Sequence, residues 1–154
     1  MANGSDSPQR PTRTSWASSE AIRRTMQSNR GRDTGPELLL RRELHGLGLR
    51  YRVNVRVEPT LRRTVDIAFT KVKLAVFVDG CFWHGCPVHG TSPKTNSDFW
   101  NSKIGATEKR DLETSEALDR LGWKVLRFWE HDNPEESAKQ VFEMMHVLRC
   151  AQTH

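Results

Sequence analysis

Residues 81–89 (CFWHGCPVH) have the composition of a metal-binding loop. Two cysteines, two histidines and two large aromatic side chains lie within this stretch, which is too short to bury all of them. Thiolates and imidazoles at close spacing are typical zinc ligands. Because Cys81, Cys86 and His89 are separated by gaps of four and two residues, one loop could supply three ligands of a zinc site.

A structural zinc site needs a fourth ligand, and two histidines compete for that role. His131 follows an apolar segment that we expect to form a strand beside the one preceding the loop, so it would finish near the cysteines. His84 lies inside the loop, and as a ligand it would leave His89 free. The residue types alone do not decide between them. Cys150 is isolated near the C-terminus, where we expect a small buried thiol.

A second group of candidate residues consists of carboxylates. Asp66 interrupts the apolar segment 65–69 (VDIAF), where a carboxylate is costly unless it is paired, holds a cation or faces solvent on an edge strand. Asp79 ends the next apolar run, so both acids could converge at one edge of a sheet. Such hard oxygen ligands suit Mg²⁺. Glu37 could join them, although its place in a helix-capping sequence already explains it.

The charge distribution favours a nucleic-acid partner. The chain of 154 residues carries a formal net charge of +5, and seven arginines lie between Arg41 and Arg63 against two acids. Guanidinium groups match phosphate geometry, although a solvated basic surface would have the same composition. Two carboxylates beside a basic surface point to phosphodiester cleavage. No apolar run approaches the roughly 20 residues of a membrane helix, and we expect a cytoplasmic protein.

The hydrophobic pattern predicts one domain with an α/β or α+β fold. Residues 1–15 are rich in Ser, Pro, Arg and Thr and predict a disordered basic tail, which leaves residues 16–154 as a single domain. The expected elements are helices at 18–27 and 34–46, strands at 51–57, 64–69 and 74–78, a helix capped by Ser97 or Asp98 and reaching 104, a longer helix stopping at 122, a strand at 123–129, and a helix capped by Asn133. This order predicts a three-layer domain with a central mixed sheet flanked by helices.

Several of these segments resemble one family of enzymes. Residues 78–86 (VDGCFWHGC), 93–96 (PKTN), 99–100 (FW) and 122–126 (GWKVL) are similar to the very-short-patch repair DNA mismatch endonucleases. Residues 32–37 (RDTGPE) and Asp66 resemble the same family in the same order, so the likeness runs from about residue 23 to 146. It implies a restriction-endonuclease-like fold. It also implies an enzyme that nicks one strand beside a T:G mispair left by 5-methylcytosine deamination.

The resemblance also implies roles for individual residues. Asp66 and the backbone carbonyl of Val78 would bind Mg²⁺, Glu37 would order a water, and His84 would act in proton transfer. Zinc would then be held by Cys81, Cys86, His89 and His131. Some family members have histidine where this chain has Asp79, which would either be an extra metal ligand or orient His84.

The aromatic residues of the loop gain a use from the same resemblance. Phe82, Trp83 and Trp100 would wedge into the base stack beside the mispair, and Met26 would approach the duplex from the other side. Alternatively, Trp100 and one of the pair would cover the zinc loop. The implied partner is duplex DNA with a T:G mismatch, with mismatch-repair proteins as further partners of a monomeric, nucleoid-associated bacterial enzyme. The alternatives are a non-catalytic zinc-stabilised DNA-binding module and a nuclease of the same fold with another DNA substrate.

Overall fold

The computed structural model describes residues 32–89 and 94–153. Its elements follow the predicted order of a helix, three strands, a helix, a strand and a helix. They are α2 (Gly35–Gly46), β1 (Arg52–Val55), β2 (Val65–Phe69), β3 (Leu74–Asp79), α3 (Ser97–Arg120), β4 (Lys124–Trp129) and α4 (Pro134–Gln152). The predicted tail, the predicted helix at 18–27 and Met26 lie outside the described residues.

The strands form one mixed sheet in the order β1-β2-β3-β4. β2 is antiparallel to both β1 and β3, whereas β3 and β4 are parallel, with Phe77 opposite Arg127. β3 is therefore a central strand, as its almost continuous apolar sequence predicted. Because β3 and β4 are parallel, both strands end at the same edge of the sheet.

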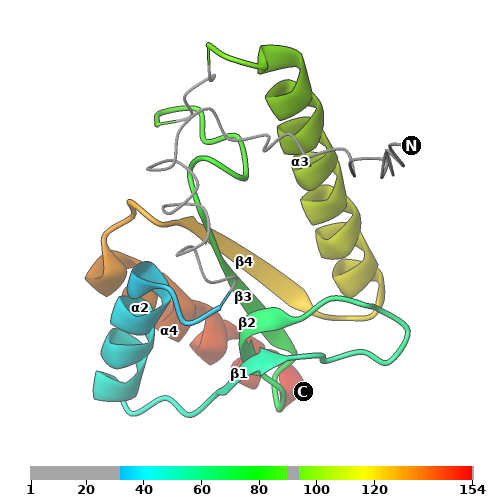
Figure 1. The fold of residues 1–154 in the computed structure, drawn as a ribbon. Helices are drawn as coiled ribbons and strands as arrows, with labels where there is room; N and C mark the ends of the chain where they lie inside the picture. The colour runs from blue at the N-terminus through cyan, green and yellow to red at the C-terminus, as the bar shows by residue number, and fades with distance from the viewer. Residues whose placement is uncertain (1–31, 90–93, 154) are drawn as a thin grey trace, which may run out of the picture.

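Helices cover both faces of the sheet, which gives the predicted mixed α/β domain with three layers (Figure 1). On one face, α2 and α4 pack over a core that includes Leu44, Ile67 and Val141. On the other face, α3 packs Leu118 against β-strand residues such as Ala75. Side chains alternate between the two faces along each strand, so the α3 face also receives residues two positions away from Ala75.

The predicted helix caps are present at α2 and α4. The Thr34 side chain accepts from the backbone N–H of Glu37 while the Glu37 carboxylate accepts from the N–H of Thr34, which completes a capping box. The Asn133 side chain likewise accepts from two backbone N–H groups in the first turn of α4. Both helices also have proline in the first turn, where its missing donor costs nothing.

Two predictions about helices were wrong. The two helices expected between residues 97 and 122 are one continuous helix, α3, because no proline interrupts it and Gly105 alone does not break it. The residue preceding α3 is Asn96 in a left-handed conformation, rather than Ser97 or Asp98.

The expectation that Cys150 is buried was also wrong. Cys150 is exposed, because it lies off the buried stripe of α4 that contains Val141 and Met145. In the described residues, the helices are too short or too polar to cross a membrane.

Candidate active site

The two strand carboxylates lie on the α3 face of the sheet. Asp66 is two residues before Ala68, and Asp79 is two residues after Phe77, and both of these apolar residues belong to the core beneath α3. The backbone N–H of Val78 donates a 2.9 Å hydrogen bond to Asp66 Oδ2. The predicted convergence of these two acids at one edge of the sheet is therefore present.

Asp66 is a carboxyl group in a partly buried, acidic environment. Its pKa is raised from 3.8 to about 6, mainly by burial and in addition by the nearby carboxylates of Glu37 and Asp79. The hydrogen bond from Val78 and the positive charge of Arg127 oppose this rise in pKa. A carboxylate that is crowded by like charges gains stability from a cation, so this position fits a hard metal ion such as Mg²⁺.

Glu37 reaches the same region from the N-terminus of α2. Its side chain is buried, with 2% of the residue exposed, and its Oε2 lies 3.2 Å from the guanidinium of Arg41. The helix cap and this ion pair give a structural reason for Glu37. The residue nevertheless lines one open cleft of about 790 Å³ together with Asp66, Asp79 and His84.

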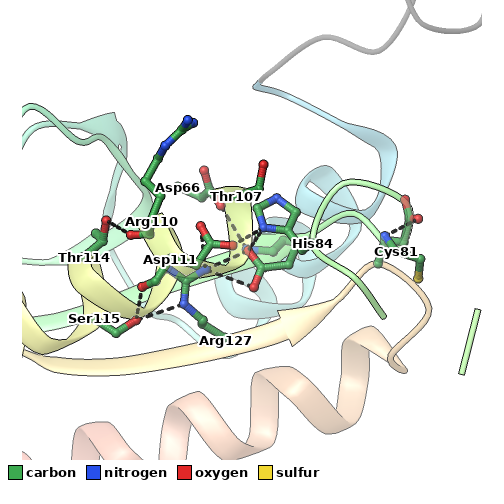
Figure 2. Close-up of polar contacts among 12 residues, drawn as sticks. Asp66, Cys81, His84, Thr107, Arg110, Asp111, Thr114, Ser115 and Arg127 are labelled. Atoms are coloured by element: carbon green, nitrogen blue, oxygen red, sulfur yellow. Dashed lines mark hydrogen bonds and ion pairs between the residues drawn. The ribbon is translucent and has the colours of Figure 1, made fainter. Parts of the chain in front are cut away.

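His84 belongs to the carboxylate cluster. Its Nδ1 forms a hydrogen bond with Asp111 Oδ2 of α3 and lies 3.7 Å from Asp79 Oδ1 (Figure 2). A carboxylate that accepts from Nδ1–H fixes the tautomer and leaves Nε2 as the basic nitrogen. Sequence reasoning missed Asp111, since an acid on a polar helix carries no distinguishing local signal.

Arg127 is a second cleft residue that sequence reasoning missed. It projects from β4 between the sheet and α3, as Figure 2 shows, and its NH1 donates to both carboxylate oxygens of Asp79 at 2.9 and 3.0 Å. A signal did exist, because Arg127 interrupts the apolar strand 123–129 in the way that Asp66 interrupts its own strand. Arg63 and Arg110 also line the cleft, which gives it a basic rim suited to phosphate.

The four predicted zinc ligands come together at the end of β4. One ligand atom from each residue lies within 4.8 Å of all the others; the residues are Cys81, Cys86, His89 and His131. Cys81 Sγ lies 3.0 Å from His131 Nδ1. Two sulfur and two imidazole donors at these separations fit the donor set and size of a tetrahedral zinc site. His84 is instead grouped with Asp79 and Asp111.

Glu130 anchors the start of this loop through two hydrogen bonds. Desolvation, together with the Cys86 thiol and the Glu130 carboxylate, raises the pKa of Cys81 to about 12. Glu130 Oε1 accepts a 2.8 Å hydrogen bond from the backbone N–H of Cys81, and the N–H of Glu130 donates to the Asp79 carbonyl at 2.9 Å. Glu130, which sequence reasoning also missed, thus ties the start of the loop to the end of β4.

The aromatic residues form one cluster near the start of α3. The Phe82 ring packs edge-on against Trp83 and Trp100 at centroid distances of 5.2 and 5.4 Å, and Trp83 lies 6.0 Å from Trp100. Trp100 is 4% exposed, whereas Phe82 and Trp83 are only partly buried. Trp100 therefore supports the other two rings from within, and Phe82 and Trp83 present the accessible surface.

The chain is similar to known proteins over most of its length. A family model described as DNA mismatch endonuclease Vsr matches residues 18–89. The type II nicking enzyme V.NaeI of Lentzea aerocolonigenes is 42% identical over 127 residues, which cover 81% of this chain and 76% of that protein. The chain belongs to the Vsr family of DNA mismatch endonucleases.

Further relatives extend the Vsr likeness. The type II nicking enzyme V.HpaIIP of Haemophilus parainfluenzae is 39% identical over 128 residues, covering 80% of this chain and 88% of that protein. The DNA mismatch endonuclease Vsr of Escherichia coli (strain K12) is 35% identical over 109 residues, which cover 70% of this chain and 67% of that protein. The family predicted from the sequence is confirmed. As a Vsr-family protein, the chain is an endonuclease that acts on DNA.

Proposed function

We propose that this endonuclease nicks one strand of duplex DNA beside a T:G mispair by Mg²⁺-dependent hydrolysis, and so initiates very-short-patch repair. The observation that carries the proposal is the open cleft in which Asp66, Glu37 and His84 meet under a basic rim. Relatives named as nicking enzymes and as a mismatch endonuclease support a single-strand cut at a mispair. The element order likewise supports assignment to the restriction-endonuclease-like fold.

Asp66 and the Val78 backbone carbonyl are the proposed Mg²⁺ ligands. When bound, Mg²⁺ supplies Lewis-acid stabilisation of negative charge on the phosphate. Asp66 accepts a hydrogen bond from the Val78 N–H, and the carboxylates of Glu37 and Asp79, which add to the rise in its pKa, would also attract a cation. Glu37 is proposed to hold a water molecule in the same cleft, with Arg41 holding its carboxylate in position.

His84 is the proposed proton acceptor. With Nδ1 hydrogen-bonded to Asp111, its Nε2 can take a proton from the attacking water directly or through a second water. Asp111 then stabilises the imidazolium, as a carboxylate does beside any catalytic histidine. Asp79 lies close enough to His84 Nδ1 to support this orientation electrostatically.

Zinc is proposed as a structural ion bound by Cys81, Cys86, His89 and His131. Its binding would fix both ends of the loop to the end of β4 and hold Phe82 and Trp83 outward. These two rings are the proposed wedge, with Trp100 as their support, because opening the base stack costs a few kcal/mol and least at a mispair. Met26 remains a proposed contact on the other side of the duplex.

The proposed setting is the bacterial cytoplasm, where the enzyme would act on nucleoid DNA as a monomer and alongside mismatch-repair proteins. The test of the reaction is the Asp66→Ala variant on matched duplexes with a T:G, T:A or C:G pair. We expect the native protein to nick only the T:G duplex, and only with Mg²⁺. Asp66→Ala should lose at least about 10³-fold in rate and still bind the duplex.

The matched control is Asp119→Ala, which removes an exposed carboxylate from α3. Its nicking rate should equal that of the native protein. Mg²⁺-dependent nicking that persists in Asp66→Ala would refute the metal assignment, and equal nicking of T:G and T:A duplexes would refute the substrate.

A further inference from the structure

Arg127 connects β4 to both β3 and α3. Besides its two hydrogen bonds to Asp79, its Nε donates to Ser115 Oγ at 3.0 Å and its NH2 donates to the Asp111 carbonyl at 3.3 Å. The guanidinium carbon lies 4.3 Å from the centre of the Phe77 ring. All three guanidinium nitrogens are therefore engaged, and the group lies against an aromatic ring.

The carboxylates beside Arg127 have a geometry that would suit a metal ion. One ligand atom each from Asp79, His84 and Asp111 lies within 4.8 Å of the others. Two carboxylates and an imidazole are a common ligand set for divalent cations. Coordination of a metal ion by Asp79 would compete with Arg127, because Arg127 NH1 already donates hydrogen bonds to both carboxylate oxygens of Asp79.

We propose that Arg127 is a positioning residue that excludes a divalent cation from the Asp79–His84–Asp111 group. Its NH1 bonds both oxygens of Asp79 and lies 3.7 Å from Asp111 Oδ1, so a positive charge already lies beside both carboxylates. The cation is thereby confined to the Asp66 side of the cleft, and His84 stays available for proton transfer. This role in catalysis rests on the proposed function, whereas the exclusion of the ion is a property of the protein alone.

The test counts Mn²⁺ ions bound per chain, by electron paramagnetic resonance on zinc-replete full-length protein without DNA. Arg127→Met keeps an apolar side chain over Phe77 and removes the charge, and should bind one more Mn²⁺ than the native protein. The double variant with Asp79→Asn should return to the native number. Arg127→Lys keeps a cation near Asp79 and should also bind the native number.

Arg110→Met is the matched control, since Arg110 lines the same cleft and forms no ion pair with any residue in 32–89 or 94–153. It should leave the Mn²⁺ count unchanged. If Arg127→Met does not fold, Arg127→Gln, which also removes the positive charge, is measured in its place and should likewise bind one more Mn²⁺ than the native protein.

Nicking provides a separate readout. Arg127→Met should lose about 10-fold or more in rate at saturating Mg²⁺, and Asp79→Asn in the same chain should recover part of the loss. A native Mn²⁺ count in Arg127→Met would overturn the inference, as would a rate loss that Asp79→Asn leaves unchanged. A native protein that fails to nick T:G duplexes while Arg127→Met gains an ion would refute the proposed function and leave the exclusion intact.

Discussion

Replacing Asp66 by Asn should stabilise the protein in the absence of Mg²⁺, although it should abolish activity. The pKa of Asp66 rises from 3.8 to about 6 on folding, so the folded state binds its proton more tightly than the unfolded state. The buried Asp66 charge lowers the free energy of unfolding. This destabilisation is absent below the unfolded-state pKa of 3.8, grows as the pH rises, and is complete above the folded-state pKa of about 6. This rise in pKa corresponds to a destabilisation of about 3 kcal/mol at pH 8.

The same relation gives a destabilisation of about 1.6 kcal/mol at pH 5, about half the value at pH 8. Asn is neutral at every pH and its side-chain oxygen can still accept from the Val78 N–H, so the variant avoids the penalty. For a chain of this length, each kcal/mol of stability shifts the melting temperature by about 2–4 °C. Asp66→Asn should therefore melt roughly 6–12 °C above the native protein at pH 8. The gain should shrink to about half at pH 5.

Thermal unfolding followed by circular dichroism measures this difference, in buffer that lacks Mg²⁺ and with protein that retains zinc. Adding Mg²⁺ should raise the melting temperature of the native protein and leave Asp66→Asn unchanged. Asp119→Asn, an exposed change on α3, should melt like the native protein at both pH values. Two results would refute this prediction: an Asp66→Asn variant less stable than the native protein at pH 8, or a difference in melting temperature that does not vary with pH. Either result would show that burial does not raise the pKa of Asp66.

Three further results are expected from the loop and its supports. His84→Ala should lose at least about 10²-fold in nicking rate and keep its zinc, whereas Cys86→Ala should lose zinc, as measured by atomic absorption. Zinc lost from His84→Ala and kept in Cys86→Ala would make His84, rather than Cys86, the zinc ligand. Gly85→Ala should destabilise the protein by about 1–2 kcal/mol in urea denaturation, mainly because Gly85 has φ +64°, where an L side chain is strained. The added Cβ would also displace the carboxylate of the exposed Glu108 side chain, which can move away at a smaller cost. A Glu108→Ala background should remove the steric part only. Asp111→Asn should lower the nicking rate about 10²-fold or more without weakening duplex binding in a gel-shift assay, and weakened binding would indicate a structural role instead.

The sequence predicted the sheet and its site because the informative residues contradict their surroundings. Asp66 and Asp79 are acids in apolar strands, and a strand next to the central one was expected to bring His131 to the cysteines. A charged residue in an apolar strand breaks the local pattern, and such breaks are expected at functional sites, so they can be recognised in the sequence without a structure. α3 was divided wrongly after residue 104, where the helix is continuous, and Leu112, which was expected to mark the second helix, is 60% exposed.

Asp111 and Arg127 were missed for different reasons. Asp111 is one of several acids along a polar helix, and only the packing of α3 on the sheet brings it to His84. Arg127 carried the same signal as Asp66, namely a charge within an apolar strand. Its partner Asp79 lies in the adjacent strand with a register offset of two residues, which only strand pairing reveals.

The end of β3 serves both candidate metal sites, and the contacts divide that work. Val78 donates to Asp66 on the cleft side, while the Asp79 carbonyl and the Cys81 N–H both bond Glu130 on the zinc side. His84 follows Cys81 by three residues but is bonded separately to α3. Because a loop with two independent attachments cannot move as one piece when only one is lost, the position of His84 depends on Asp111 as well as on the proposed zinc. Phe82 and Trp83, the proposed wedge, lie between Cys81 and His84 in the sequence, so the proposed chemistry and the proposed mispair recognition share one short segment.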